Sequence, residues 1–121
     1  VLICKGNCDS EVDQLVLNTP IQSPYVHAFA DGRHIVATHG HMVESDEAKE
    51  AMAAAIKADI FISGHVHYTV LEKRGNTVFL NPGSPSLSKR EDGRQTCAVI
   101  SDVDIKVYDV NTAEVLAEFK F

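Results

Sequence analysis

The fold-deciding stretch is Ile60-Phe61-Ile62-Ser63-Gly64-His65-Val66-His67, a continuous apolar run that ends in a glycine and two histidines. A continuous run, unlike an alternating one, is typical of a strand that is buried on both faces, as in a parallel sheet. Upstream, the run Ile35 to Thr38 has the same character and is followed by His39-Gly40-His41. The two stretches predict two parallel strands, each ending in a polar loop marked by glycine.

The segment between these runs predicts a helix. Residues Glu44 to Ala58 are rich in alanine, with acidic residues in the first turn and Lys57 near the end, which suits the helix dipole. The result is a strand–helix–strand unit with a right-handed crossover. A shorter helix is predicted from Ser10 to Leu17, ending before Pro20.

A third apolar run, Val1 to Cys4, opens the chain and is followed by Gly6-Asn7-Cys8-Asp9. Ligands of open α/β sheets bind beyond the carboxyl ends of the strands. If the three runs are neighbouring parallel strands, their polar clusters converge on one sheet edge. Because natural chains seldom begin inside a strand, we expect an N-terminal portion of the domain to be missing before Val1.

The second half of the chain alternates. Ile105 and Val107 alternate with polar residues, and so do Ala117 and Phe119, which is the period of strands with one buried face. Pairs of turn residues separate the expected strands: Asp31-Gly32, Gly75-Asn76, Asp92-Gly93 and Asn111-Thr112. We predict an α/β fold, a single partial domain over residues 1–121, with a C-terminal antiparallel meander.

The composition and the net charge limit the classes of function that the chain can have. The chain has 121 residues and a net charge of −6, and it shows no basic patch of the kind that nucleic-acid binders carry. The three cysteines, Cys4, Cys8 and Cys97, include no Cys-x-x-Cys pair. Their odd number favours reduced thiols and a cytoplasmic setting. No apolar run approaches membrane-spanning length, so no membrane partner is expected.

Four of the six histidines fall in the two His-x-His segments. Histidine clusters suit Zn, Mn, Fe or Ni. In an extended chain, residues i and i+2 share a face about 6.5 Å apart, and paired catalytic ions lie about 3.5–4 Å apart, so one segment can serve two ions. The residues alone leave alternatives open: single structural histidines, one structural metal site, a Cys8 that merely packs, and an Asn81-Pro82-Gly83-Ser84 segment that is only a turn.

At these residues the sequence resembles the calcineurin-like metallophosphoesterase superfamily, in particular its YfcE-type bacterial phosphodiesterases. The resemblance runs in order through Gly6-Asn7-Cys8-Asp9, Thr38-His39-Gly40-His41, Gly64-His65-Val66-His67 and Asn81-Pro82-Gly83-Ser84. It covers essentially the whole chain, and it implies a two-sheet sandwich flanked by helices.

The resemblance also implies a dinuclear site of divalent metal ions, such as manganese. Asn7, His39 and His65 correspond to ligands of one ion, and His67 to a ligand of the other. The remaining ligands of the family lie in an earlier Asp-x-His motif and a Gly-Asp motif that supplies the bridging Asp. Neither motif occurs before Asn7 in this sequence.

The implied reaction is hydrolysis of a small phosphodiester or phosphomonoester by a metal-bridged hydroxide. His41 would stabilise charge on the phosphoryl oxygens, and Asp9 would orient its neighbours. Cys8 stands where many relatives carry a proton-donating His. The alternative is a non-catalytic, metal-binding or scaffold protein of the same fold. We also expect a homo-oligomer, because apolar sheet surface and an open sheet edge seek partners.

Overall fold

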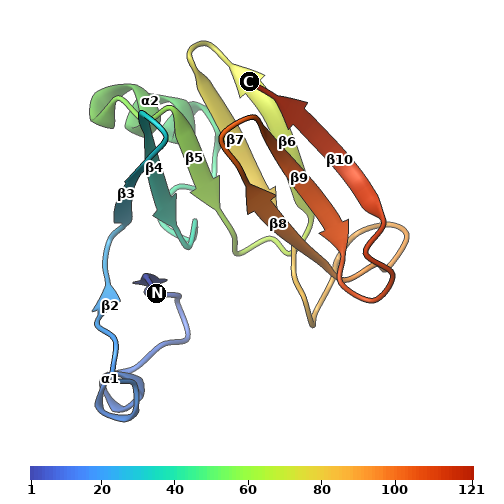
Figure 1. Ribbon diagram of the computed structural model, residues 1–121. Coiled ribbons are helices and arrows are strands. Elements are labelled where there is room, and N and C mark those ends of the chain that lie inside the picture. Colours follow the sequence, from blue (N-terminus) through green and yellow to red (C-terminus); the bar gives the residue numbers. More distant parts are fainter.

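The computed structural model describes residues 1–121 and contains two helices and ten strands in three sheets (Figure 1). In chain order, the elements are β1 (Ile3–Cys4), α1 (Glu11–Val16), β2 (Ile21–Gln22), β3 (Val26–Ala30), β4 (Arg33–Thr38), α2 (Asp46–Ile56), β5 (Ile60–Ser63), β6 (Thr69–Arg74), β7 (Thr77–Pro82), β8 (Thr96–Ile100), β9 (Asp104–Asp109) and β10 (Val115–Lys120). No helix combines the length and the apolar character needed to cross a bilayer.

The central sheet has five strands in the order β3-β4-β5-β7-β6. The predicted parallel pair is confirmed: β4 and β5 run side by side, with Ile35 opposite Ile60 and Thr38 opposite Ser63. Helix α2 connects them, as expected. It is shorter than the predicted segment because Ser45 caps its start through Ala48 N–H, and Lys57 ends it in the left-handed conformation.

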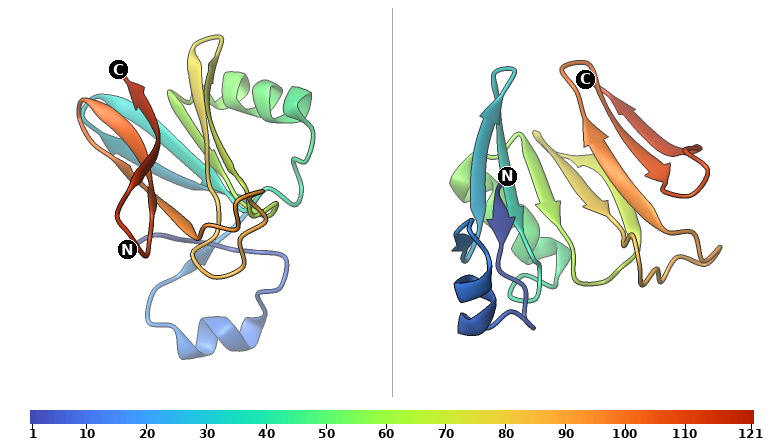
Figure 2. Two further views of the ribbon diagram at one scale, coloured as in Figure 1. Left: turned by 90° about the vertical axis from the view of Figure 1, so that its right-hand side faces the viewer. Right: turned by 60° about the horizontal axis from the view of Figure 1, so that its bottom comes forward.

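The two faces of the central sheet carry two apolar cores. On one face, Val36, Phe61 and Phe79 pack with Ala53 of α2 and Ala58. On the other face, three buried side chains of the central sheet meet Ile105 and Val107 of the three-stranded sheet β10-β9-β8. The result is the expected two-sheet sandwich with a helix on its outer face (Figures 1 and 2).

The C-terminal meander is confirmed for β8, β9 and β10, which pair antiparallel. The hairpin formed by β6 and β7 was expected to belong to the meander. It joins the central sheet instead, where β7 runs parallel to β5. The reason is burial: Thr77 to Asn81 are all buried, so this strand needs cover on both faces and cannot serve in a half-exposed meander.

The first apolar run does not join the central sheet, so the picture of three neighbouring parallel strands is wrong. β1 pairs in parallel with β2, in a separate two-stranded sheet. The hairpin partner β3 occupies one edge of β4 while β5 occupies the other, which leaves no edge of β4 for β1. Helix α1 buries no side chain and lies apart from the two larger sheets (Figure 2).

Candidate metal centre

Three side chains from distant parts of the sequence meet beyond the carboxyl ends of β4 and β5. The Oδ1 atom of Asn7 lies 2.8 Å from Nε2 of His39, and Nδ1 of His65 lies 3.2 Å from the same His39 nitrogen. Three atoms that can each present a lone pair therefore crowd into one small volume. Such spacing between donor atoms suits the coordination shell of a single ion, whose bonds to imidazole nitrogen are about 2.0–2.1 Å for zinc.

The converging atoms face a cavity of about 430 Å³ that also has His67 in its wall. The remaining lining residues come from the N-terminal loop and include Cys8 and Asp9. The structure thus gathers Asn7, His39 and His67 with His65 around one space, although β1 lies outside the central sheet.

Glycine makes the close approach of the two histidine loops possible. Gly40 has a φ of 104°, and a Cβ at this position would lie 3.2 Å from the carbonyl oxygen of Gly64. The amide of Gly64 donates to the His39 carbonyl across 2.9 Å. A side chain at position 40 would push His39 and His65 apart, so this glycine sets their distance.

The backbone of the second histidine loop differs from the extended form assumed for His-x-His. His65 and His67 have φ values of 71° and 59°, in the left-handed region that non-glycine residues seldom occupy. Strand β5 has ended at Ser63 and β6 begins only at Thr69, so the loop turns between them. The prediction that His65-Val66-His67 is extended is therefore wrong. The strained turn brings the rings of His65 and His67 to the same cavity.

The imidazoles of His65 and His67 each have an oxygen atom near one ring nitrogen that can accept a hydrogen bond from it. Nε2 of His65 lies 3.5 Å from the exposed carboxylate of Glu44, and Nδ1 of His67 lies 2.9 Å from the carbonyl oxygen of Leu87. An acceptor at one ring nitrogen fixes the proton there and leaves the lone pair on the other nitrogen. Glu44 was not foreseen as a site residue, because at the start of a helical segment it reads as a dipole partner.

His41 sits behind the converging set. Its ring centroid is 5.3 Å from that of His39 and 6.3 Å from that of His65. Its Nδ1 atom is buried and has no hydrogen-bond partner. A buried polar atom without a partner is uncommon and marks a place where a ligand or water satisfies it.

Asp9 holds the loop that presents Asn7. Its Oδ2 atom accepts a 2.6 Å hydrogen bond from the amide of Gly6. A Cβ at Gly6 would lie 3.3 Å from Nδ1 of His39, so this loop passes directly over the His39 ring. The role of Asp9 in orienting its neighbours stays a prediction, to which this contact gives a structural basis.

The Asn81-Pro82-Gly83-Ser84 segment supports the second histidine loop. Nδ2 of Asn81 donates to the carbonyl oxygen of Gly64 across 3.3 Å, and Oδ1 of Asn81 accepts from the amide of Gly83 at 3.0 Å. Asn81 is buried. The segment is therefore the end of β7 and the loop after it, which hold the backbone of Gly64 in place, and its side chains do not line the cavity.

The chemistry of the donor set fits a divalent transition metal. Burial lowers the pKa of His39, and the nearby rings of His65 and His41 lower it further, which favours the neutral form that binds metals. Only two of the converging atoms belong to His, Cys, Asp or Glu side chains, and no group of three or more such side chains is arranged to hold an ion. The third converging atom is the amide oxygen of Asn7.

Comparison with known proteins places this arrangement in a family. Residues 1–105 match the model of the calcineurin-like phosphoesterase superfamily domain. The chain belongs to the calcineurin-like phosphoesterase superfamily. The matched residues contain all three loops of the site, from Asn7 to His67.

Among curated proteins, the chain is 33% identical to phosphodiesterase YfcE of Escherichia coli K12 over 118 residues, which are 98% of this chain and 61% of the relative. The solved structure of this phosphoesterase from E. coli matches with a TM-score of 0.80 and 28% identity, covering 98% of this chain and 63% of that chain. This chain therefore spans about 61% of the length of the curated relatives that it matches.

A more distant likeness concerns the fold alone. The Zn²⁺ complex of wild-type Vps29 from Entamoeba histolytica matches with a TM-score of 0.70 and 22% identity, covering 99% of this chain and 68% of that chain. The calcineurin-like fold is thus shared with a protein whose solved structure holds zinc.

Proposed function

We propose that this chain carries the metal-binding loops of a metal-dependent phosphoesterase that hydrolyses small phosphodiesters or phosphomonoesters. The observation that carries the proposal is the convergence of Asn7 Oδ1, His39 Nε2 and His65 Nδ1. Membership in the calcineurin-like superfamily supports the reaction class. The acidic chain, with a net charge of −6, needs cations beside it to accept an anionic ester.

Asn7, His39 and His65 would hold one divalent ion, and His67 would hold a second through Nε2, since its Nδ1 faces Leu87 O. Imidazole and amide donors suit Mn, Zn, Fe or Ni. When bound, such ions supply Lewis-acid activation of water and neutralise phosphate charge.

The side chains around these donors have separate tasks. Asp9 fixes the Asn7 loop through Gly6. The buried, unpartnered Nδ1 of His41 places a ring nitrogen where a hydrogen bond can form once a ligand is present, and we assign His41 to stabilising the phosphoryl oxygens. Cys8 is exposed in the cavity wall, and from its place in the sequence we assign it to the position of the proton donor to the leaving alcohol.

The test uses the metal-depleted chain. Mn²⁺ is titrated in while turnover of bis-p-nitrophenyl phosphate and of p-nitrophenyl phosphate is followed. We expect turnover that saturates with Mn²⁺, disappears with a chelator and is lost in His39→Ala. A control variant, His34→Ala, removes a ring that contacts His27 on the β3–β4 hairpin, and it should keep full activity. Turnover that is independent of metal would contradict the proposal.

A non-catalytic metal-binding or scaffold protein is the second candidate. It is favoured by the donor set itself, because the converging atoms include no carboxylate and the carboxylate of Asp9, in the same cavity wall, accepts a hydrogen bond from Gly6 N–H. In the same titration this candidate predicts saturable Mn²⁺ binding, lost in His39→Ala, with no turnover of either ester.

A further inference from the structure

The segment from Leu87 to Lys89 is hydrogen-bonded to the His67 loop at two points. The amide of Lys89 donates to the carbonyl oxygen of His67 across 2.8 Å, and the His67 ring contacts Leu87 O at 2.9 Å. Lys89 therefore starts from a backbone position beside a candidate metal ligand. Its flexible four-carbon stem can carry the ammonium group to the space in front of that ligand.

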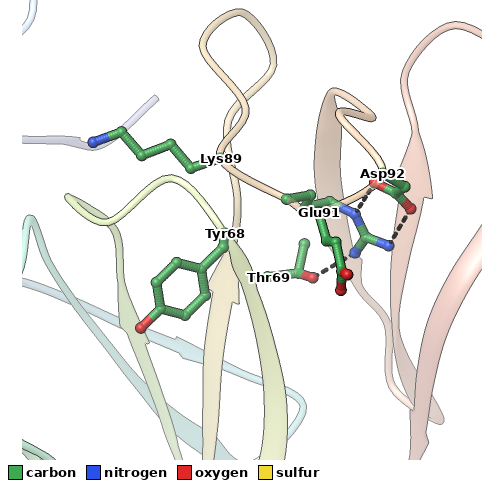
Figure 3. Close-up of a pocket in the computed structure, with 6 residues that line it drawn as sticks. Tyr68, Thr69, Lys89, Glu91 and Asp92 are labelled. Atoms are coloured by element: carbon green, nitrogen blue, oxygen red, sulfur yellow. Dashed lines mark hydrogen bonds and ion pairs between the residues drawn. The ribbon is translucent and has the colours of Figure 1, made fainter.

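Lys89 is a free cation in a neighbourhood where the other cation is committed. Arg90 forms a two-point contact with Asp92, at 2.9 and 2.8 Å, and donates to Thr69 Oγ1 at 2.5 Å. Lys89 is exposed and takes part in no ion pair. Figure 3 shows its side chain extending away from the Arg90–Asp92 pair.

A cavity of about 540 Å³ opens between this segment and the start of β6. Its walls are Tyr68, Thr69, Lys89, Arg90, Glu91 and Asp92 (Figure 3). Lys89, in this wall, is hydrogen-bonded through its backbone to His67, which lines the cavity of the candidate metal centre, so the two cavities lie on either side of the His67 loop. The polar walls offer hydroxyl and carboxylate groups, and Glu91 takes part in no ion pair. Such walls suit an alcohol that carries hydroxyl groups more than an apolar one.

We propose that this cavity is the subsite for the alcohol part of the substrate, and that Lys89 at its rim binds the phosphate charge. The inference rests on the proposed phosphoesterase function and specifies its substrate class: phosphate esters of polar, hydroxyl-bearing alcohols. A phosphomonoester carries up to two negative charges at neutral pH and a diester carries one. Lys89 therefore contributes more to binding monoesters.

The test compares Lys89→Gln, Lys89→Arg and Glu91→Ala in the Mn²⁺-loaded chain. Lys73→Gln is the matched control, because Lys73 is also exposed and takes part in no ion pair, near the opposite end of β6. The substrates are glycerol phosphate, p-nitrophenyl phosphate and bis-p-nitrophenyl phosphate. Mn²⁺ affinity is measured in parallel.

Loss of a hydrogen bond to a charged group should lower kcat/KM of Lys89→Gln by about tenfold or more on both monoesters, mainly through KM. The loss should be smaller on the diester. Lys89→Arg should restore most of the activity, and Lys73→Gln and Mn²⁺ affinity should not change. Glu91→Ala should weaken turnover of glycerol phosphate alone, since p-nitrophenol has no hydroxyl group left to bind there.

Two outcomes separate the inference from the function on which it rests. If the wild-type chain turns over these esters and Lys89→Gln equals Lys73→Gln, the subsite assignment is wrong and the phosphoesterase function stands. If the Mn²⁺-loaded wild-type chain hydrolyses none of the esters, measured as released p-nitrophenol for the aryl esters and as released phosphate for glycerol phosphate, the proposed function fails and the subsite fails with it.

Discussion

The Nε2 atom of His39 lies 2.8 Å from the Oδ1 atom of Asn7, although 32 residues separate the two in the chain. The contact joins the loop after β1 to the loop after β4, two strands that share no sheet. Without an ion, the His39 ring can hold this contact by donating Nε2–H to the amide oxygen of Asn7. Under the proposed function, a cation would take the place of that proton between Asn7, His39 and His65.

Asn7→Ala should therefore weaken Mn²⁺ or Zn²⁺ binding by more than the roughly 10–100-fold seen when only an outer partner of a ligand is lost. Calorimetric titration of the metal-depleted chain measures it. The rise in thermal stability on adding metal should shrink in parallel, because a ligand stabilises the state that binds it. An Asn7→Ala chain with wild-type affinity would rule out Asn7 as a ligand.

Glu44→Gln tests the outer partner of His65. The carboxylate lies 3.5 Å from Nε2, where it favours a proton on that nitrogen and a lone pair on Nδ1. Metal affinity should fall by about tenfold, the lower end of the usual range, because Glu44 is exposed. Glu47→Gln, in the first turn of α2 and three residues after Glu44, is the control and should bind metal as the wild type does.

Gly83→Ala should destabilise the fold. Gly83 has a φ of 81°, and a Cβ there would lie 2.1 Å from Thr96 Oγ1. Left-handed strain and overpacking together should lower the free energy of unfolding by about 3 kcal/mol. Gly93→Ala measures the cost of left-handed strain alone, because Gly93 has a φ of 70° and no atom lies within 4 Å of the added Cβ. Urea unfolding curves compare the two, and equal losses would show that the Thr96 contact is not the cause.

We expect the chain to self-associate through α1, pairing with a second copy. This helix buries none of its residues, and Leu15 and Val16 are 84% and 76% exposed. Exposed apolar clusters of this kind seek partners. Light scattering over a range of concentrations should show a mass above that of the monomer, and Leu15→Ser with Val16→Ser should return it to 13.2 kDa. A wild-type monomer at high concentration would contradict this.

Cys8→His should introduce a proton donor into the cavity that the candidate metal ligands face. Cys8 is exposed in the cavity wall, so a larger ring can be accommodated there. Turnover of alkyl phosphodiesters should rise toward the roughly 10²–10⁴-fold that general-acid catalysis supplies. Aryl diesters should gain little, since a nitrophenolate leaves without a proton. Steady-state rates on both classes are the measurement, and equal gains on both would refute the role given to Cys8.

The sequence by itself determined the parallel core and the chemistry at its edge. Continuous apolar runs identified β4 and β5, because only a strand covered on both faces lacks polar alternation. The glycine and histidine clusters after them predicted two neighbouring polar loops, since strand direction sends both loops to one sheet edge. The alternation of Ile105 and Val107 likewise identified β9 and its buried face.

Only the tertiary structure decided which edges pair and how the donors converge. β3 takes one edge of β4, β1 lies outside the central sheet and β7 enters it, because strand pairing depends on competition between segments that no local pattern records. The left-handed backbone of His65 and His67 could not be read from residue type, because residues other than glycine seldom adopt it. The partnership of Glu44 with His65 could not be read either, because a contact across 21 residues forms only once the chain has folded around its core.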